Sequence, residues 1–248
     1  MTALPESPLA LRIGDALPSR SPRFDAIVDA ETRTLQAVRA HGPAMLEDGA
    51  MAAWLANQPT SAGLLWRLTA DREQRRAAFA ATAAVGWEGD LHVCMLASSS
   101  EDNDACSMGL LADARQYGIA HHRIVLEISE TEAVQSPDQL ARAAGLWRAM
   151  GFRTGILRFG GGLSGLALML LLEPAVVCLD GDWIRRVAID HGTRIIVAGI
   201  VNTCRELGCQ AIADGVISDR LSVVLSDLGV RCQSGPLFTL PAGLPLGR

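Results

Sequence analysis

The chain has 248 residues, of which 49% are hydrophobic, 20% are charged and only 4% are aromatic. This length and hydrophobic share favour one large α/β domain whose core consists mostly of Ala, Leu, Val and Ile. The net charge of −5 argues against a general attraction to nucleic acid, and the lack of lysine in the sequence excludes catalysis by a lysine side chain.

In chain order, a loose N-terminal arm over residues 1–20, rich in Pro, Ser and Arg, precedes an expected domain over residues 21–244. Short β-branched runs predict strands at residues 26–29, 35–38, 91–96, 123–128, 153–158, 176–179, 210–213 and 231–233. Helical patterns lie between most of them, at residues 50–56, 73–84, 108–117, 137–150, 164–172, 183–207 and 220–228. Because strands and helices alternate, the pattern predicts a parallel sheet that closes into a barrel, with a hairpin-like stretch at residues 31–33.

The cysteines and the apolar runs indicate a cytoplasmic protein. Six cysteines are scattered without a Cys-x-x-Cys pair, so buried free thiols are expected. The five histidines show no ligand spacing with them, and zinc is therefore not expected. The first residues do not resemble a signal peptide, and the longest apolar run, Leu166 to Leu172, is too short to span a bilayer. The cysteines are Cys94, Cys106, Cys178, Cys204, Cys209 and Cys232.

The most informative motif lies at the end of the predicted strand 153–158. From Gly155 to Gly165 the chain reads Gly-Ile-Leu-Arg-Phe-Gly-Gly-Gly-Leu-Ser-Gly, a strand end followed by a glycine-rich turn and a helix start. The segment resembles the Asp-Asp-Phe-Gly-Thr-Gly signature of EAL domains, the bacterial phosphodiesterases that linearise cyclic di-GMP. Leu157 and Arg158 stand where that family has its two aspartates. The resemblance extends from about Phe24 to Pro241 and implies an α/β fold, a modified (β/α)8 TIM-type barrel with one antiparallel strand near the N-terminus.

The resemblance also marks the other positions of a vestigial site. Glu127, in Leu-Glu-Ile-Ser-Glu, matches a family metal ligand, although these residues would equally suit the N-terminus of a helix. Asp180 and Asp214 stay acidic at two further positions. The replaced positions are Gln36 in the motif that names the family, Leu96 for an asparagine ligand, Cys178 for a lysine, Ile217 for a second acid and Ser234 for a glutamine.

These replacements predict a site without metal, without cofactor and without enzyme activity. Two divalent ions need several carboxylates, and Glu127 is the clear survivor. A guanidinium about 4 Å from a dication costs roughly 8 kcal/mol at an effective dielectric constant of about 20. We therefore expect Arg158 to form an ion pair with Glu127 where the metals would lie.

The favoured function is that of a catalytically inactive EAL-domain protein, a regulatory module that binds an unidentified protein partner in cyclic di-GMP signalling. Trp54, Trp66 and Trp87 are candidate anchors for that partner. No nucleic-acid or membrane partner is expected. The resemblance further implies a homodimer, since EAL-like domains often pair through helices near the sixth strand.

Two alternatives stay open. The first is a receptor that binds cyclic di-GMP without metal, with Arg39 or Arg158 contacting the phosphates. The second is an active phosphodiesterase whose ligands are rearranged to Asp180, Asp214 and Glu130. The second would have to tolerate Arg158 near its metals, so the electrostatic cost above disfavours it.

Overall fold

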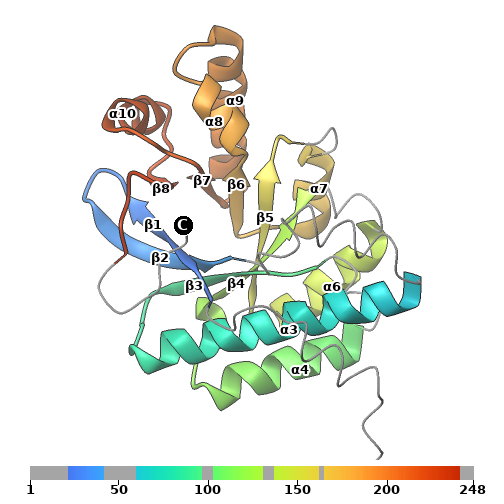
Figure 1. The fold of residues 1–248 in the computed structure, drawn as a ribbon. Coiled ribbons are helices and arrows are strands. Elements are labelled where there is room, and N and C mark those ends of the chain that lie inside the picture. The colour runs from blue at the N-terminus through green and yellow to red at the C-terminus, as the bar shows by residue number, and fades with distance from the viewer. Residues whose placement is uncertain (1–21, 42–59, 97–102, 131–136, 162–164, 241–248) are drawn as a thin grey trace, which may run out of the picture.

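The computed structural model of the protein describes residues 22–41, 60–96, 103–130, 137–161 and 165–240. Eight strands form a closed barrel in sequence order, with helices packed around it (Figure 1). The strands are β1 (Phe24–Asp29), β2 (Thr34–Ala40), β3 (Asp90–Cys94), β4 (Ile124–Ser129), β5 (Arg153–Phe159), β6 (Val176–Leu179), β7 (Gln210–Ala213) and β8 (Cys232–Ser234). The helices are α3 (Thr60–Ala84), α4 (Asn103–Gln116), α6 (Pro137–Ala149), α7 (Gly165–Leu172), α8 (Gly181–Arg186), α9 (His191–Glu206) and α10 (Asp219–Asp227), with a 3-10 turn at His121–Arg123.

Strand β1 is the exception to the parallel order of the barrel. It pairs antiparallel with both β2 and β8, whereas every other neighbouring pair is parallel. The predicted barrel with one antiparallel strand near the N-terminus is confirmed. All eight predicted strands are present, each with ends within two residues of the expected ones.

The helices depart from the prediction in two ways: α3 and α4 begin 13 and five residues earlier than the helices expected at 73–84 and 108–117, and one expected helix is divided. The single helix expected over residues 183–207 is two helices, α8 and α9. The chain breaks between them because Asp190 caps the second helix, accepting hydrogen bonds from the backbone N–H groups of Gly192 and Thr193. The predicted arm at residues 1–20 and the predicted helix at residues 50–56 lie outside the described residues, as do residues 241–244 of the expected domain.

The core has an inner and an outer part. The inner cluster lies inside the barrel, since its members come from strands all around the sheet: Ile27, Ala37, Val125, Val176, Cys178, Ile212 and Cys232. The outer cluster fills the space between the strands and the helices, where Phe79 of α3 and Trp147 of α6 are fully buried. Where the strand pairing is regular, period-two alternation decides which side chains enter the barrel. Within the described ranges, no helix combines the length and the apolar character that a membrane crossing requires.

Candidate functional site

A buried arginine, Arg39 on β2, dominates the polar part of the barrel interior. Its Nε donates to Glu127 Oε2 at 2.8 Å, and its Nη2 donates to Glu127 Oε1 at 3.2 Å. Both side chains are almost fully excluded from solvent, with 4% and 0% exposure. The two parallel hydrogen bonds make a forked arginine–carboxylate pair, the strong form of this interaction.

The same guanidinium spans the barrel. From β2 it reaches Glu127 on β4, and its Nη2 also donates to Cys178 Sγ on β6 at 3.0 Å. Its Nη1 donates to Asp214 Oδ2, just after β7, at 3.2 Å. Arg39 is thus a fixed positive charge that joins side chains from three other strands or strand ends.

Glu127 is held in its charged form. Burial by itself raises its pKa, but Arg39 and His92 outweigh burial and lower the pKa to about 2. His92 Nδ1 lies 2.7 Å from Glu127 Oε1. Because an ionised carboxylate only accepts hydrogen bonds, Nδ1 of His92 carries the hydrogen and donates it.

The partners of Arg39 differ in charge. Burial raises the pKa of the Cys178 thiol well above its ordinary value, so this sulfur accepts the hydrogen bond as an uncharged thiol. Burial also acts to lower the pKa of Arg39, but its contacts with Cys178, Glu127 and Asp214 hold that pKa well above the ordinary value. The interior therefore contains a guanidinium balanced mainly by one buried carboxylate.

The predicted ion pair between Arg158 and Glu127 is wrong. The pairing of β5 with β6 shifts register between Ile156 and Phe159, and Arg158 has a positive φ of 56°. This local change leaves Leu157 packed against the inner cluster and turns the side chain of Arg158 out to solvent. The cation that meets Glu127 is Arg39, which we expected to contact a phosphate.

The other predicted positions fall into two groups. Cys178 and Asp214 lie with Glu127 around Arg39. Gln36 is exposed at a register shift, where β1 pairs Ile27 with Ala37 and Val28 with Leu35, and its Nε2 donates to Thr34 Oγ1 at 2.8 Å.

The remaining predicted positions lie around the barrel ends. Asp180 is half-buried and caps α8 by accepting a hydrogen bond from Asp182 N at 2.8 Å. Ile217 is 61% exposed. Leu96, just after β3, and Ser234, on β8, are buried. None of these four contacts Arg39 through a described hydrogen bond or ion pair.

Sequence reasoning missed His92 and the structural role of Arg39. Strand pairing brings these residues together: Arg39 pairs in register with His92, and two residues further along β3 Cys94 pairs with Glu127. Residues that are two positions apart on a strand point to the same face, so Ala37 and Arg39 both face the interior. The pairing of β2 with β1 and β3 sets this phase and places Arg39, and not Gln36, in the barrel.

A pair of divalent metals does not fit the described residues in this arrangement. Glu127 is already bound by Arg39 and His92, and Arg39 also occupies the approach to Asp214. Among the described residues no three His, Cys, Asp or Glu side chains are grouped so that they could hold a metal ion. A dication beside the guanidinium would also meet the repulsion estimated above.

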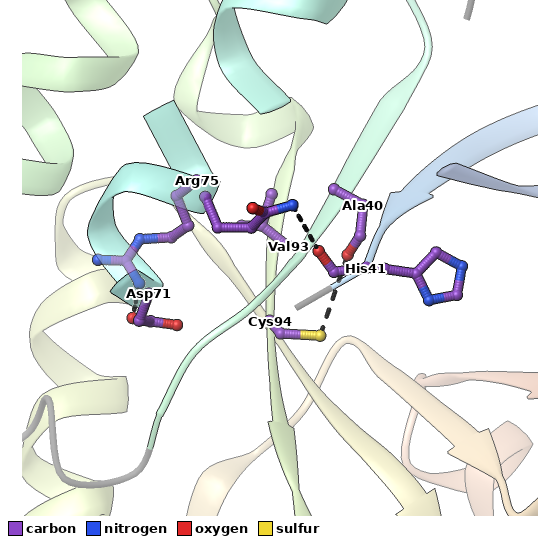
Figure 2. A pocket seen from close by; sticks show the side chains of 7 residues that line it. Ala40, His41, Asp71, Arg75, Val93 and Cys94 are labelled. Carbon is purple, nitrogen blue, oxygen red and sulfur yellow. Dashed lines mark hydrogen bonds and ion pairs between the residues drawn. The ribbon is translucent and has the colours of Figure 1, made fainter. Parts of the chain in front are cut away.

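A small cavity lies outside the barrel wall, between β2, β3 and α3 (Figure 2). Its volume is about 10 Å³, enough for roughly one water molecule. Asp71 and Arg75 form a buried ion pair on one side, and Gln74 Nε2 donates to the carbonyl oxygen of His41 at 3.3 Å on the other. The cavity is too small for a nucleotide, and it is not a candidate ligand site.

Comparison with known proteins places this geometry in a family. The sequence model described as EAL domain matches residues 19–241. The chain is 27% identical to the "blue light- and temperature-regulated antirepressor BluF" of Escherichia coli over 135 residues, which are 54% of this chain and 33% of BluF. It is 24% identical to the "cyclic di-GMP phosphodiesterase PdeB" of Shewanella oneidensis over 128 residues, 52% of this chain and 15% of PdeB.

Solved structures share the fold. Klebsiella pneumoniae BlrP1, in a manganese and cyclic di-GMP complex, superimposes with a TM-score of 0.77 at 25% identity, over 91% of this chain and 57% of that chain. The chain thus spans only part of each of these three relatives. The prediction that it is not an enzyme is contradicted by these relatives, because one that matches half of the chain is named a cyclic di-GMP phosphodiesterase. Replaced ligand positions are not enough to exclude activity.

Proposed function

The chain belongs to the EAL domain family, and from this premise we propose that it acts in cytoplasmic cyclic di-GMP signalling as a regulatory module that binds another protein. The observation that carries the proposal is the internal ion pair of Arg39 and Glu127. Because the chain's own guanidinium neutralises the buried carboxylate, the barrel needs no bound cation for its charge balance. The similarity to a protein named an antirepressor supports a regulatory role.

Three exposed isoleucines on and just before α9 support a protein partner and define the proposed surface. Ile195 and Ile196 on α9 are 58% and 51% exposed, and Ile189, just before this helix, is 88% exposed. Large neighbouring apolar side chains in contact with water are typical of binding surfaces. Trp87, the described one of the three predicted anchors, is half-buried against the core, and its Nε1 donates to the carbonyl oxygen of Asp90 at 3.0 Å.

We expect the double substitution Ile195→Glu and Ile196→Glu to remove the partner. Two charges in an apolar interface cost several kcal/mol, so the amount of complex recovered after cross-linking in cells of the source organism should fall at least about tenfold. The control is Leu170→Glu on α7, a 73% exposed leucine on another helix, which should leave recovery unchanged. If the same complex persists in the double variant, or if light scattering shows only copies of this chain in it, the proposed surface is wrong.

A second candidate function is binding of cyclic di-GMP at the barrel mouth through Arg158. Its exposed side chain lies at the carboxyl end of β5, while the N–H groups of Arg39 already donate to Glu127, Asp214 and Cys178. Charge-assisted hydrogen bonds from arginine can hold a phosphate without metal. BlrP1, which has the same fold, was solved with cyclic di-GMP.

For this candidate we expect calorimetry with cyclic di-GMP to show binding in the presence of a chelator, weakened about tenfold or more in Arg158→Ala. Arg115→Ala on α4, also an exposed arginine, is the control and should bind like the wild type. Product formation is followed in parallel with added manganese. Binding that needs manganese and proceeds to hydrolysis would assign the chain as a phosphodiesterase, and equal binding by both variants would remove Arg158 from the site.

A further inference from the structure

A groove of about 390 Å³ lies between α9 and the first residues of β7 and β8. It is at the opposite end of the barrel from Asp214, which follows the last residue of β7. Three thiols line it, those of Cys204, Cys209 and Cys232. All three are free cysteines in the structure.

The end of α9 brings two of these thiols together. Gly208 has a φ of +71°, its N–H donates to Arg205 O at 3.1 Å, and the N–H of Cys209 donates to Cys204 O at 2.9 Å. These two bonds form the Schellman motif, in which the residue after the glycine contacts the residue that begins the last helical turn. In this chain both residues are cysteines, so the motif brings two thiols together on the wall of the groove.

The two thiols are not equivalent. Cys209 is 8% exposed and Cys204 only 1%, so a small molecule in the groove meets Cys209 first. The interaction between the two thiols lowers the pKa of Cys209 and raises that of Cys204. Cys209 is thus the better nucleophile, with a second thiol in contact with it.

We propose that Cys204 and Cys209 form a modification site, at which hydrogen peroxide entering the groove oxidises the dithiol to a disulfide. The Cys209 thiolate attacks one peroxide oxygen, the O–O bond breaks, and the leaving hydroxide takes up a proton to become water. The Cys204 sulfur then attacks the sulfenic sulfur of Cys209. As the S–S bond forms, the S–O bond breaks and a second water leaves with the proton of Cys204. The two thiols lose two electrons and the peroxide gains them.

The third thiol in the groove offers a matched comparison. Gln210 Nε2 donates to Cys232 Sγ at 2.9 Å, and burial raises the pKa of Cys232 to about 11. Cys232 therefore lines the same groove without a thiol partner of its own among its described contacts. It should not enter the disulfide.

Tryptic peptides test the proposal directly, because Arg205 separates the two cysteines. The full-length folded protein is treated with hydrogen peroxide, its remaining thiols are alkylated, and it is digested. We expect peptides 195–205 and 206–220, which carry Cys204 and Cys209, to appear joined by a disulfide that dithiothreitol reverses. Cys232→Ala should give the same linked pair in the same yield. In Cys204→Ala, Cys209 should stop at its oxygen-containing acids, since no second thiol completes the reaction.

Three results would overturn the site. The wild-type peptides could stay unlinked, Cys209 could join Cys232 instead, or linkage could require prior unfolding. Each is read from wild-type protein, so the conclusion does not depend on whether a variant folds. Circular dichroism recorded before digestion shows whether the treated protein is still folded.

Discussion

Replacing Arg39 with alanine is expected to lower the free energy of unfolding by about 3 to 5 kcal/mol, because it leaves the buried carboxylate of Glu127 without its cation. Glu127 is 1% exposed, so water cannot replace the lost partner. His92 would keep one hydrogen bond to Glu127 Oε1, and Asp214 would lose its contact with the guanidinium. Urea unfolding of the two proteins at neutral pH measures the difference.

The matched control is Arg158→Ala, an exposed arginine at the barrel mouth, which should change stability by less than about 1 kcal/mol. A double variant, Arg39→Met with Glu127→Gln, removes both charges together. Its loss of unfolding free energy should be smaller than the sum of the losses in Arg39→Met and Glu127→Gln measured singly. In the double variant neither buried charge is left unpaired. If Arg39→Ala costs no more than Arg158→Ala, the guanidinium does not hold the barrel interior together.

Glu127 is also expected to make the free energy of unfolding depend on pH in the acidic range. Its pKa in the folded protein is about 2, below the ordinary value of 4.5, so between these values the unfolded chain binds more protons. The stabilisation is complete above pH 4.5 and is lost as the pH falls toward 2. At about 1.4 kcal/mol for each pH unit, the loss is roughly 3 kcal/mol.

A comparison with Glu127→Gln isolates this contribution from the other acids. Below pH 4.5 the wild type should lose stability more steeply than the variant, and the two free energies of unfolding should converge near pH 2. Chemical unfolding at several pH values provides both curves. Parallel curves would mean that Glu127 is not held charged by Arg39 and His92.

Both predictions concern the charged side chains inside the barrel. Arg39, Glu127 and Asp214 form a polar interior that the protein satisfies by itself. Buried ion pairs often add little net stability compared with apolar side chains, yet breaking one is costly. A ligand that needed Glu127 would therefore have to displace Arg39, whereas Arg158 outside is open to contact.

Local chemistry in the sequence determined the strands, the barrel and the family resemblance. Most strands contain β-branched residues in short runs, and a strand end followed by Gly160 and Gly161 is readable without knowledge of distant contacts. Eight such runs separated by helical patterns leave few ways to bury all the apolar faces, so a closed barrel follows. Because functional side chains of such barrels lie at the carboxyl ends of the strands, the polar residues there could be named as candidate site residues.

Only the tertiary structure decided which arginine meets Glu127. A register shift of a single residue in β5 and the positive φ of Arg158 turn that side chain outward. The phase of β2 turns Arg39 inward, where the closed barrel brings β4 and β6 within reach of its guanidinium. A one-residue change of phase exchanges the two faces of a strand, and which phase occurs depends on pairing with neighbours far away in the chain.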